Sequence, residues 1–276
     1  MNKGDIEPRE RKGPLKLLWG MIVRPRATLE YLSTMQKKRW WVPALLMLVI
    51  LITVTAANSM AATRTAQQFM MESPVGMPAG KEGVAPPSPG MSPEEEGNIM
   101  PSPAGVAPIM LVLQSAGSMI GVILSWLLWA GALYLVIVFL GQNHVSFGAM
   151  FRMVVWVWVP SMIRGLVQSV YLFAGGSPIY NQGLSGLLMD KSPKAIMTST
   201  YIPPSMGKMV FSALLAKVDI YLFWQLGLLV LGLMIFARLP KKKALFATCG
   251  VWLLLTLLSL IPALVGGMFG QAGAMF

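Results

Sequence analysis

Two charged residues in otherwise apolar stretches, Arg164 and Asp219, are the residues of this sequence best suited to chemistry. Charges in such surroundings are costly unless they are paired or hydrated. An arginine and an aspartate together could line a polar path for a solute or an ion. They could instead form a buried ion pair that fixes the register of two helices. The sequence leaves both roles open, and we favour the structural pair.

Other arrangements typical of catalysis, cofactor binding or metal binding are missing from the sequence. It holds no GxxxxGK[ST] motif, no HExxH motif and no pair of carboxylates inside a hydrophobic segment. The single cysteine, Cys249, excludes an intramolecular disulfide and a cysteine-rich metal site. Methionines between residues 64 and 107 could bind copper(I), but without a tight repeat or a histidine they favour a plain loop. We therefore predict no catalytic residue, no cofactor and no metal site.

The composition indicates that the elements holding Arg164 and Asp219 are membrane helices. The 276-residue chain is 55% hydrophobic and 12% charged, whereas a soluble protein is about a quarter charged. The formal net charge is +11, but ten of the 22 basic residues precede Trp40. Such clustering is what orientation in a membrane produces, so we do not expect the chain to bind nucleic acid.

Five hydrophobic segments are long enough to cross a bilayer with an apolar core of about 30 Å. The predicted spans are residues 41–58, 109–140, 149–174, 210–237 and 245–269. Pro160 is expected to kink the third span. Residues 64–107, which are rich in proline and glycine, predict a disordered extracytoplasmic loop.

The basic residues also predict the orientation. Four of them, Arg238 and Lys241 to Lys243, fill the turn after the fourth span, while the loop after the first span holds two basic residues against five acidic ones. By the positive-inside rule, the N-terminus is cytoplasmic and the C-terminus extracytoplasmic. We expect a multi-pass protein of the cell (inner) membrane.

The N-terminal region predicts a cytoplasmic tail at residues 1–13, followed by amphipathic interfacial helices at residues 14–36. A first helix would place Leu15, Leu18, Trp19 and Ile22 on one face, and Pro25 would begin a second helix. Basic side chains beside such a face favour anionic lipid. The candidate lipid-surface contacts are Lys16, Trp19, Arg24 and Arg26. Packing on the protein's own loops is the alternative.

The stretch KVDIYLFWQLGLLVLGLMIFARLPKKKALFATCGVWLL resembles the Yip-domain (Ypt-interacting protein) integral membrane family in its bacterial branch. The matching positions are Asp219, Phe223, Trp224, Gly227, Gly232 and Lys241 to Lys243. The stretches LLWGMIVRPRATLEYL and HVSFGAMFRMVVWVWVPSMI resemble the family's cytoplasmic helix and third span. The likeness leaves out the loop at 64–107 and Arg164.

The resemblance implies an all-α, five-span membrane domain at residues 41–270 without catalytic activity. Eukaryotic members of the family bind small GTPases in vesicle traffic, and some bacterial members accompany ABC-type export systems. We therefore expect a non-enzymatic partner or scaffold that contacts membrane lipids and other membrane proteins, with an ABC-type transporter among them. The alternative is a small-solute or ion transporter or channel that uses Arg164 and Asp219.

Overall fold

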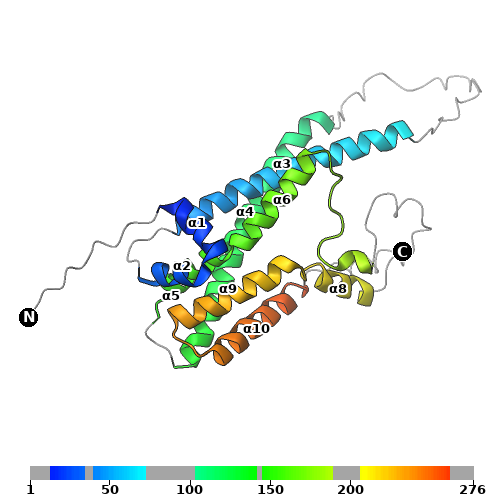
Figure 1. The fold of residues 1–276 in the computed structure, drawn as a ribbon. Helices are drawn as coiled ribbons and strands as arrows, with labels where there is room; N and C mark the ends of the chain where they lie inside the picture. The colour runs from blue at the N-terminus through cyan, green and yellow to red at the C-terminus, as the bar shows by residue number, and fades with distance from the viewer. Residues whose placement is uncertain (1–12, 35–39, 73–102, 142–144, 189–205, 262–276) are drawn as a thin grey trace, which may run out of the picture.

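The computed structural model describes residues 13–34, 40–72, 103–141, 145–188 and 206–261, and these residues form helices joined by short connections (Figure 1). The helices are α1 (Pro14–Val23), α2 (Pro25–Thr34), α3 (Trp41–Glu72), α4 (Pro103–Phe139), α5 (Phe147–Val157), α6 (Val159–Phe173), η1 (Ser185–Leu187), α8 (Met206–Leu215), α9 (Ile220–Phe236) and α10 (Lys241–Leu258). The described ranges contain no strand, which agrees with the predicted all-α class.

Three segments are long and apolar enough to cross a membrane. They are Trp41–Gln68, Val112–Phe139 and Phe147–Phe173, and the bent pair of α8 and α9 would make a fourth. Helix α10 overlaps the fifth predicted span, but it begins earlier, with three lysines, and the structure describes the chain here only as far as Ile261. The structure thus supports three or four of the five predicted spans.

The first two long helices extend beyond their predicted bounds. Helix α3 continues to Glu72 and α4 begins at Pro103, so residues 64–72 and 103–107 of the predicted disordered loop are helical. Between residues 64 and 72 the chain has no proline or glycine to end a helix, and Pro103 occupies a first turn, where proline is tolerated. Residues 73–102 of the predicted loop lie outside the described residues.

The fourth predicted span, residues 210–237, is not one continuous helix. Helix α8 ends at Leu215, α9 begins at Ile220, and the two axes are bent by 62°. Asp219 has extended backbone geometry and caps α9, because its side chain accepts a hydrogen bond from the backbone N–H of Leu222 at 2.8 Å. Aspartate is among the best residues for this position. The helix therefore restarts where the aspartate stands.

The third predicted span is interrupted close to the expected kink. Helix α5 ends at Val157 and α6 starts at Val159, with Pro160 in the first turn of α6. Proline has no N–H with which to continue the hydrogen bonds of the preceding helix. The break falls at Trp158, two residues before Pro160.

The core of the protein lies around α5. Six residues of α5, Met150 and Met153 to Val157, are buried. Helix α5 packs against α4, α9, α3 and α2. The buried residues of α5 are thus enclosed by neighbouring helices. The long helices α3, α4 and α6 lie alongside one another, while α9 and α10 form an antiparallel pair next to them (Figure 1).

The two N-terminal helices belong to the same core. Leu17 and Met21 of α1 and Leu29 of α2 are buried in the cluster that includes the long helices, and α2 lies against α9. The close approach of α1 to α2 requires glycine at position 20, because a Cβ there would collide with the Thr28 hydroxyl. The N-terminal helices are thus part of the folded body.

A buried hydroxyl on α10 offers a test of this packing. Thr248 is fully buried, and its Oγ1 has no hydrogen-bond partner among the described residues. Because an unsatisfied buried hydroxyl is destabilising, we expect Thr248→Val to stabilise the protein by about 1 kcal/mol. The measurement is the Tm of the purified protein in a mild detergent.

The matched control for this prediction is Thr55→Val. Thr55 is also buried, but its hydroxyl donates to the Leu51 carbonyl at 2.9 Å. This variant should gain no stability. A lower Tm for Thr248→Val would show that the Thr248 hydroxyl has a partner in the membrane and would contradict the prediction.

Candidate functional site

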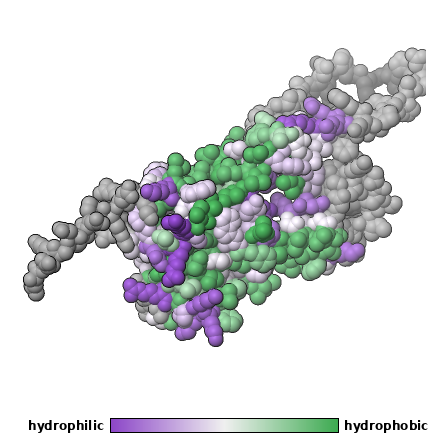
Figure 2. All heavy atoms as spheres, viewed as in Figure 1, coloured by the Kyte–Doolittle hydropathy of each residue, from purple (hydrophilic) through white to green (hydrophobic). Residues whose placement is uncertain are grey.

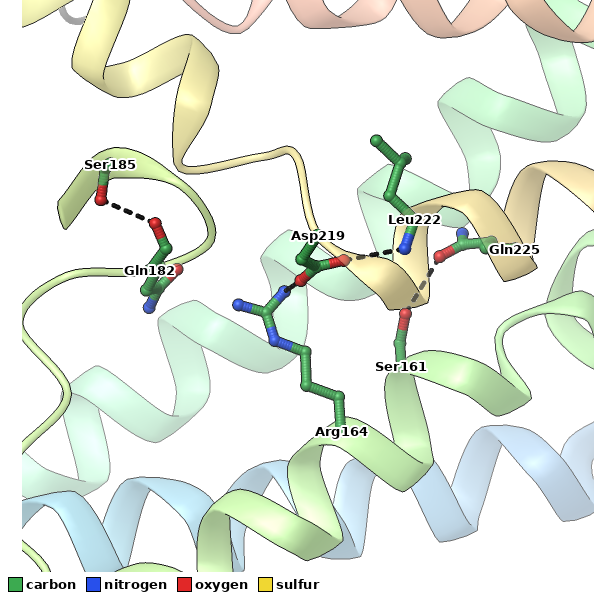
Figure 3. Close-up of polar contacts among 7 residues, drawn as sticks. All are labelled: Ser161, Arg164, Gln182, Ser185, Asp219, Leu222 and Gln225. Carbon is green, nitrogen blue, oxygen red and sulfur yellow. Dashed lines mark hydrogen bonds and ion pairs between the residues drawn. The ribbon is translucent and has the colours of Figure 1, made fainter. Parts of the chain in front are cut away.

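Arg164 of α6 and Asp219 at the start of α9 form an ion pair, which lies at the centre of Figure 3. Arg164 Nη1 is 2.7 Å from Asp219 Oδ2. The other carboxylate oxygen, Oδ1, accepts the hydrogen bond from the Leu222 N–H. The Arg164 side chain is 37% exposed and that of Asp219 only 15%. A single carboxylate therefore joins two helices and also caps one of them.

A second polar contact joins the same two helices. Ser161, one turn before Arg164 on α6, donates a hydrogen bond from its hydroxyl to Gln225 Oε1 of α9 at 3.1 Å (Figure 3). Ser161 and Gln225 were not recognised as a pair from the sequence. The spacing of three residues between Ser161 and Arg164 puts both on one face of α6, and that was the available signal. Together the two contacts fix the position of α9 on α6.

The loop after α6 covers the break between α8 and α9. Leu184 donates a backbone hydrogen bond to the Leu215 carbonyl at 3.0 Å. Gly183 has a φ of 55°, and a Cβ at this position would lie 2.7–2.8 Å from the carbonyl oxygens of Leu215, Ala216 and Val218. Only glycine meets both conditions without strain. The bend is thus held from both sides, by this loop and by Arg164.

A cavity of about 360 Å³ with mainly apolar walls borders Arg164 of the ion pair. Arg164 and Tyr171 of α6, Asn181 and Gln182 of the covering loop, and Tyr221 of α9 contribute to its walls. The Gln182 backbone carbonyl accepts a hydrogen bond from Ser185 Oγ at 2.6 Å (Figure 3). Hydroxyl, amide and guanidinium groups around one cavity can bind a small polar molecule or water.

Lys217 does not join this site, although it is close to Asp219 in sequence. It lies in the turn between α8 and α9 and lines a different cavity. Both residues fall in the predicted span 210–237, but the structure has a turn here instead of a helix. The structure thus brings together Arg164 and Asp219 and leaves Lys217 aside.

The predicted lipid-surface residues lie on or beside α1 and α2. Trp19 is 66% exposed, and Lys16, Arg24 and Arg26 are exposed as well. Arg26 Nε forms an exposed ion pair with Glu30 Oε1 at 3.0 Å, one turn later on α2. Such surface pairs contribute little to stability.

The face of α1 that was predicted to lie against lipid is not its buried face. The face of Leu15, Leu18, Trp19 and Ile22 points mainly outward, with Leu15 79% exposed. Leu17 and Met21 supply the buried face instead. Since α1 has apolar residues on both sides, it packs on the protein with one and presents the other outward. Contact of this outward face with lipid stays a prediction.

The residues that carried the family resemblance have structural positions. Asp219 caps α9, Trp224 is half-buried against the core, and Gly232 is a buried residue of α9. A Cβ on Gly232 would lie 2.5 Å from the sulfur of Met153 on α5. Gly232 therefore permits the close contact of α9 with the central helix.

The described residues contain no group of three or more His, Cys, Asp or Glu that could hold a metal ion. The methionines weighed as copper ligands lie outside them or at helix ends whose side chains are not described. The lone cysteine, Cys249, is on the exposed side of α10, between the exposed Leu245 and Leu253. These neighbours are the kind of surface that faces lipid.

Comparison with known proteins gives one clear match. A family model, the Yip1 domain, matches residues 19–262 and so covers most of the chain. It extends from α1 to the end of the described part of the C-terminal region. Neither the curated proteins nor the solved structures give a significant match.

Proposed function

Because this chain belongs to the Yip1 domain family and has apolar helices that fit a membrane, we propose that it is a non-enzymatic membrane partner or scaffold protein. It works by contact with lipids and with other membrane proteins. An ABC-type export system is the class of partner that we place first. The observation that carries the proposal is the outward apolar face of α1.

This face points outward although α1 is anchored on its other side. Leu15, Trp19 and Val23 follow one another at helical spacing, and each has more than half of its surface exposed. A soluble protein rarely leaves such a patch uncovered, and one that stays uncovered marks a site of contact with protein or membrane. The basic residues Lys16 and Arg24 beside the patch fit an anionic lipid surface.

We further propose that the end of the molecule carrying α1 faces the cytoplasm. Helices α3, α5 and α10 begin at this end, and α4 and α9 finish there (Figure 1). Its basic residues include Arg152, Arg238 and Lys241 to Lys243. Figure 2 shows hydrophilic side chains toward the two ends of the long helices and hydrophobic ones between them. The positive-inside rule then supports a cytoplasmic N-terminus and an extracytoplasmic C-terminus in the inner membrane.

The test of the scaffold role is purification from native membranes in mild detergent, with quantification of every co-purifying protein. We expect a defined membrane protein to co-purify with the wild-type chain. The Leu15→Glu/Trp19→Glu variant should recover at least about tenfold less of that protein, because a charged face cannot contact an apolar one. The Leu187→Glu variant is the control, since Leu187 is 82% exposed on η1 and far from α1 in sequence. Identical partner profiles for all three proteins would contradict the proposal.

A second candidate function, a small-solute or ion transporter or channel, has one specific observation in its favour. The bent α8–α9 pair places an ion pair and a cavity with several polar side chains beside broken helix ends. Many transporters bind substrates at such discontinuous helices. Against it, the arginine and the aspartate neutralise each other, as in a structural pair. Liposomes with the purified protein that move ions or solutes no faster than empty ones would exclude this function.

A further inference from the structure

A groove of about 500 Å³ lies between α4, α9 and α10 and extends to Ser161 of α6. Trp129 of α4, Trp158 at the α5–α6 break and Trp252 of α10 line it, together with leucines. Trp129 and Trp158 meet edge to face, with ring centroids 5.8 Å apart. The volume is in the range of pockets that hold a small ligand. Its walls are apolar and aromatic over most of their length.

One end of the groove carries an uncompensated positive charge. Lys217 lines the groove from the α8–α9 turn. No carboxylate lies within ion-pair distance of its ammonium group among the described residues, and the nearest one in sequence, Asp219, is already bound to Arg164. Ser259, at the end of α10, lines the same groove. This end can therefore accept a negatively charged group.

Deeper in the groove, a donor group lacks a partner. Gln225 accepts the Ser161 hydrogen bond through its oxygen, and its amide nitrogen has no bond within the part of the chain that the structure describes. Gln225 lines the groove. An amide N–H₂ in such a place can donate to an ester carbonyl. The polar groups are thus arranged as a cation at the mouth and a donor inside.

The groove is also open to the surface that faces lipid. Leu124 and Leu128 of α4 and Leu258 of α10 line it, and each has at least half of its surface exposed. A molecule can therefore enter sideways from the bilayer. A free water-soluble anion could bind Lys217 through its charge. It has no apolar part to bury against the three tryptophans and the leucines of the groove.

We propose that this groove binds an anionic phospholipid, with its phosphate at Lys217 and an acyl chain along the tryptophans. Charge complementarity selects the headgroup, and the aromatic wall takes the chain. The inference needs only that the helices lie in a membrane, so it can fail without affecting the scaffold role.

The test is native mass spectrometry of the purified, delipidated protein titrated with phosphatidylglycerol or with phosphatidylcholine. We expect phosphatidylglycerol to bind more tightly than phosphatidylcholine. Lys217→Ala should lower the affinity for phosphatidylglycerol about fivefold, because one basic contact to an anionic headgroup is lost. The Lys208→Ala variant removes an exposed lysine of α8 that does not line the groove, and it should bind phosphatidylglycerol like the wild type.

A second pair of variants blocks the groove without changing charge. Gly121 of α4 lines it, and a Cβ there meets no atom within 4 Å, so we expect Gly121→Trp to fold and to fill the space. Gly117, one turn earlier on α4, is equally open but does not line the groove, so Gly117→Trp is the control. We expect only Gly121→Trp to abolish retention of phosphatidylglycerol. Equal affinity for both lipids, equal binding of glycerol phosphate, or unchanged binding by Gly121→Trp would each overturn the inference.

Discussion

Replacing Asp219 with alanine is expected to destabilise the protein by about 3 kcal/mol, which combines the loss of the ion pair and of the α9 cap. Loss of one partner of a buried pair costs about 3–5 kcal/mol, but Arg164 is 37% exposed, so solvent screening reduces this part to about 2 kcal/mol. The lost N-cap adds about 1 kcal/mol. The measurement is the Tm of purified protein, together with its accumulation in membranes.

Two further variants separate the two roles of the aspartate. Asp219→Asn keeps a good N-cap residue and removes the charge, so it should lose only the ion-pair part. The exchange Arg164→Glu/Asp219→Arg restores the opposite charges but not the cap. We therefore expect this double variant to recover part of the stability lost by either single change. If it recovers nothing, the two residues do not stabilise the protein as a pair.

Replacing Gly165 with leucine is the second change with a large expected effect. A Cβ on Gly165 of α6 would lie 2.6 Å from Cγ2 of Ile50 on α3. Ile50 is buried and branched at Cβ, so its methyl group cannot turn away. Overpacking of a core costs about 1–3 kcal/mol, and we expect Gly165→Leu to lie at the upper end of this range. Thermal unfolding in detergent measures the loss.

The control for this prediction is Gly131→Leu on α4, where an added Cβ meets nothing within 4 Å. That variant should keep the wild-type Tm. The cause is tested with Gly165→Ala alone and combined with Ile50→Ala, which removes the colliding methyl group. If the loss of stability in the combined variant equals the sum of the losses in Gly165→Ala and Ile50→Ala, the contact between these two residues is not the cause of the destabilisation.

The sequence contained enough information for the helical class, the family and both members of the ion pair. Arg164 and Asp219 were recognisable because a charge in an apolar segment is rare and needs a partner. The break before Pro25 was also predictable from proline chemistry.

The break in the fourth predicted span was harder to see, although its signal was present. Residues 210–237 form one apolar segment in the sequence. The mean hydropathy of a segment does not show where the backbone leaves the helical conformation. The cap at Asp219 was the local clue. Hydropathy could not reveal that α5 is enclosed either, since lipid-facing and buried helix surfaces are both apolar. For the same reason the outward and inward faces of α1 could not be told apart.

The packing of α2 on α9 has a consequence for biosynthesis. The two helices are about 190 residues apart in the chain, so at ordinary rates of translation α2 is made roughly 10 to 40 s before its partner. During this interval Leu29 and Leu32, which are buried in the finished protein, have no helix α9 to cover them. The surface of the membrane is the nearest apolar environment that can hold them. The N-terminal helices should therefore rest on the bilayer first and dock only when the last part of the protein has been inserted.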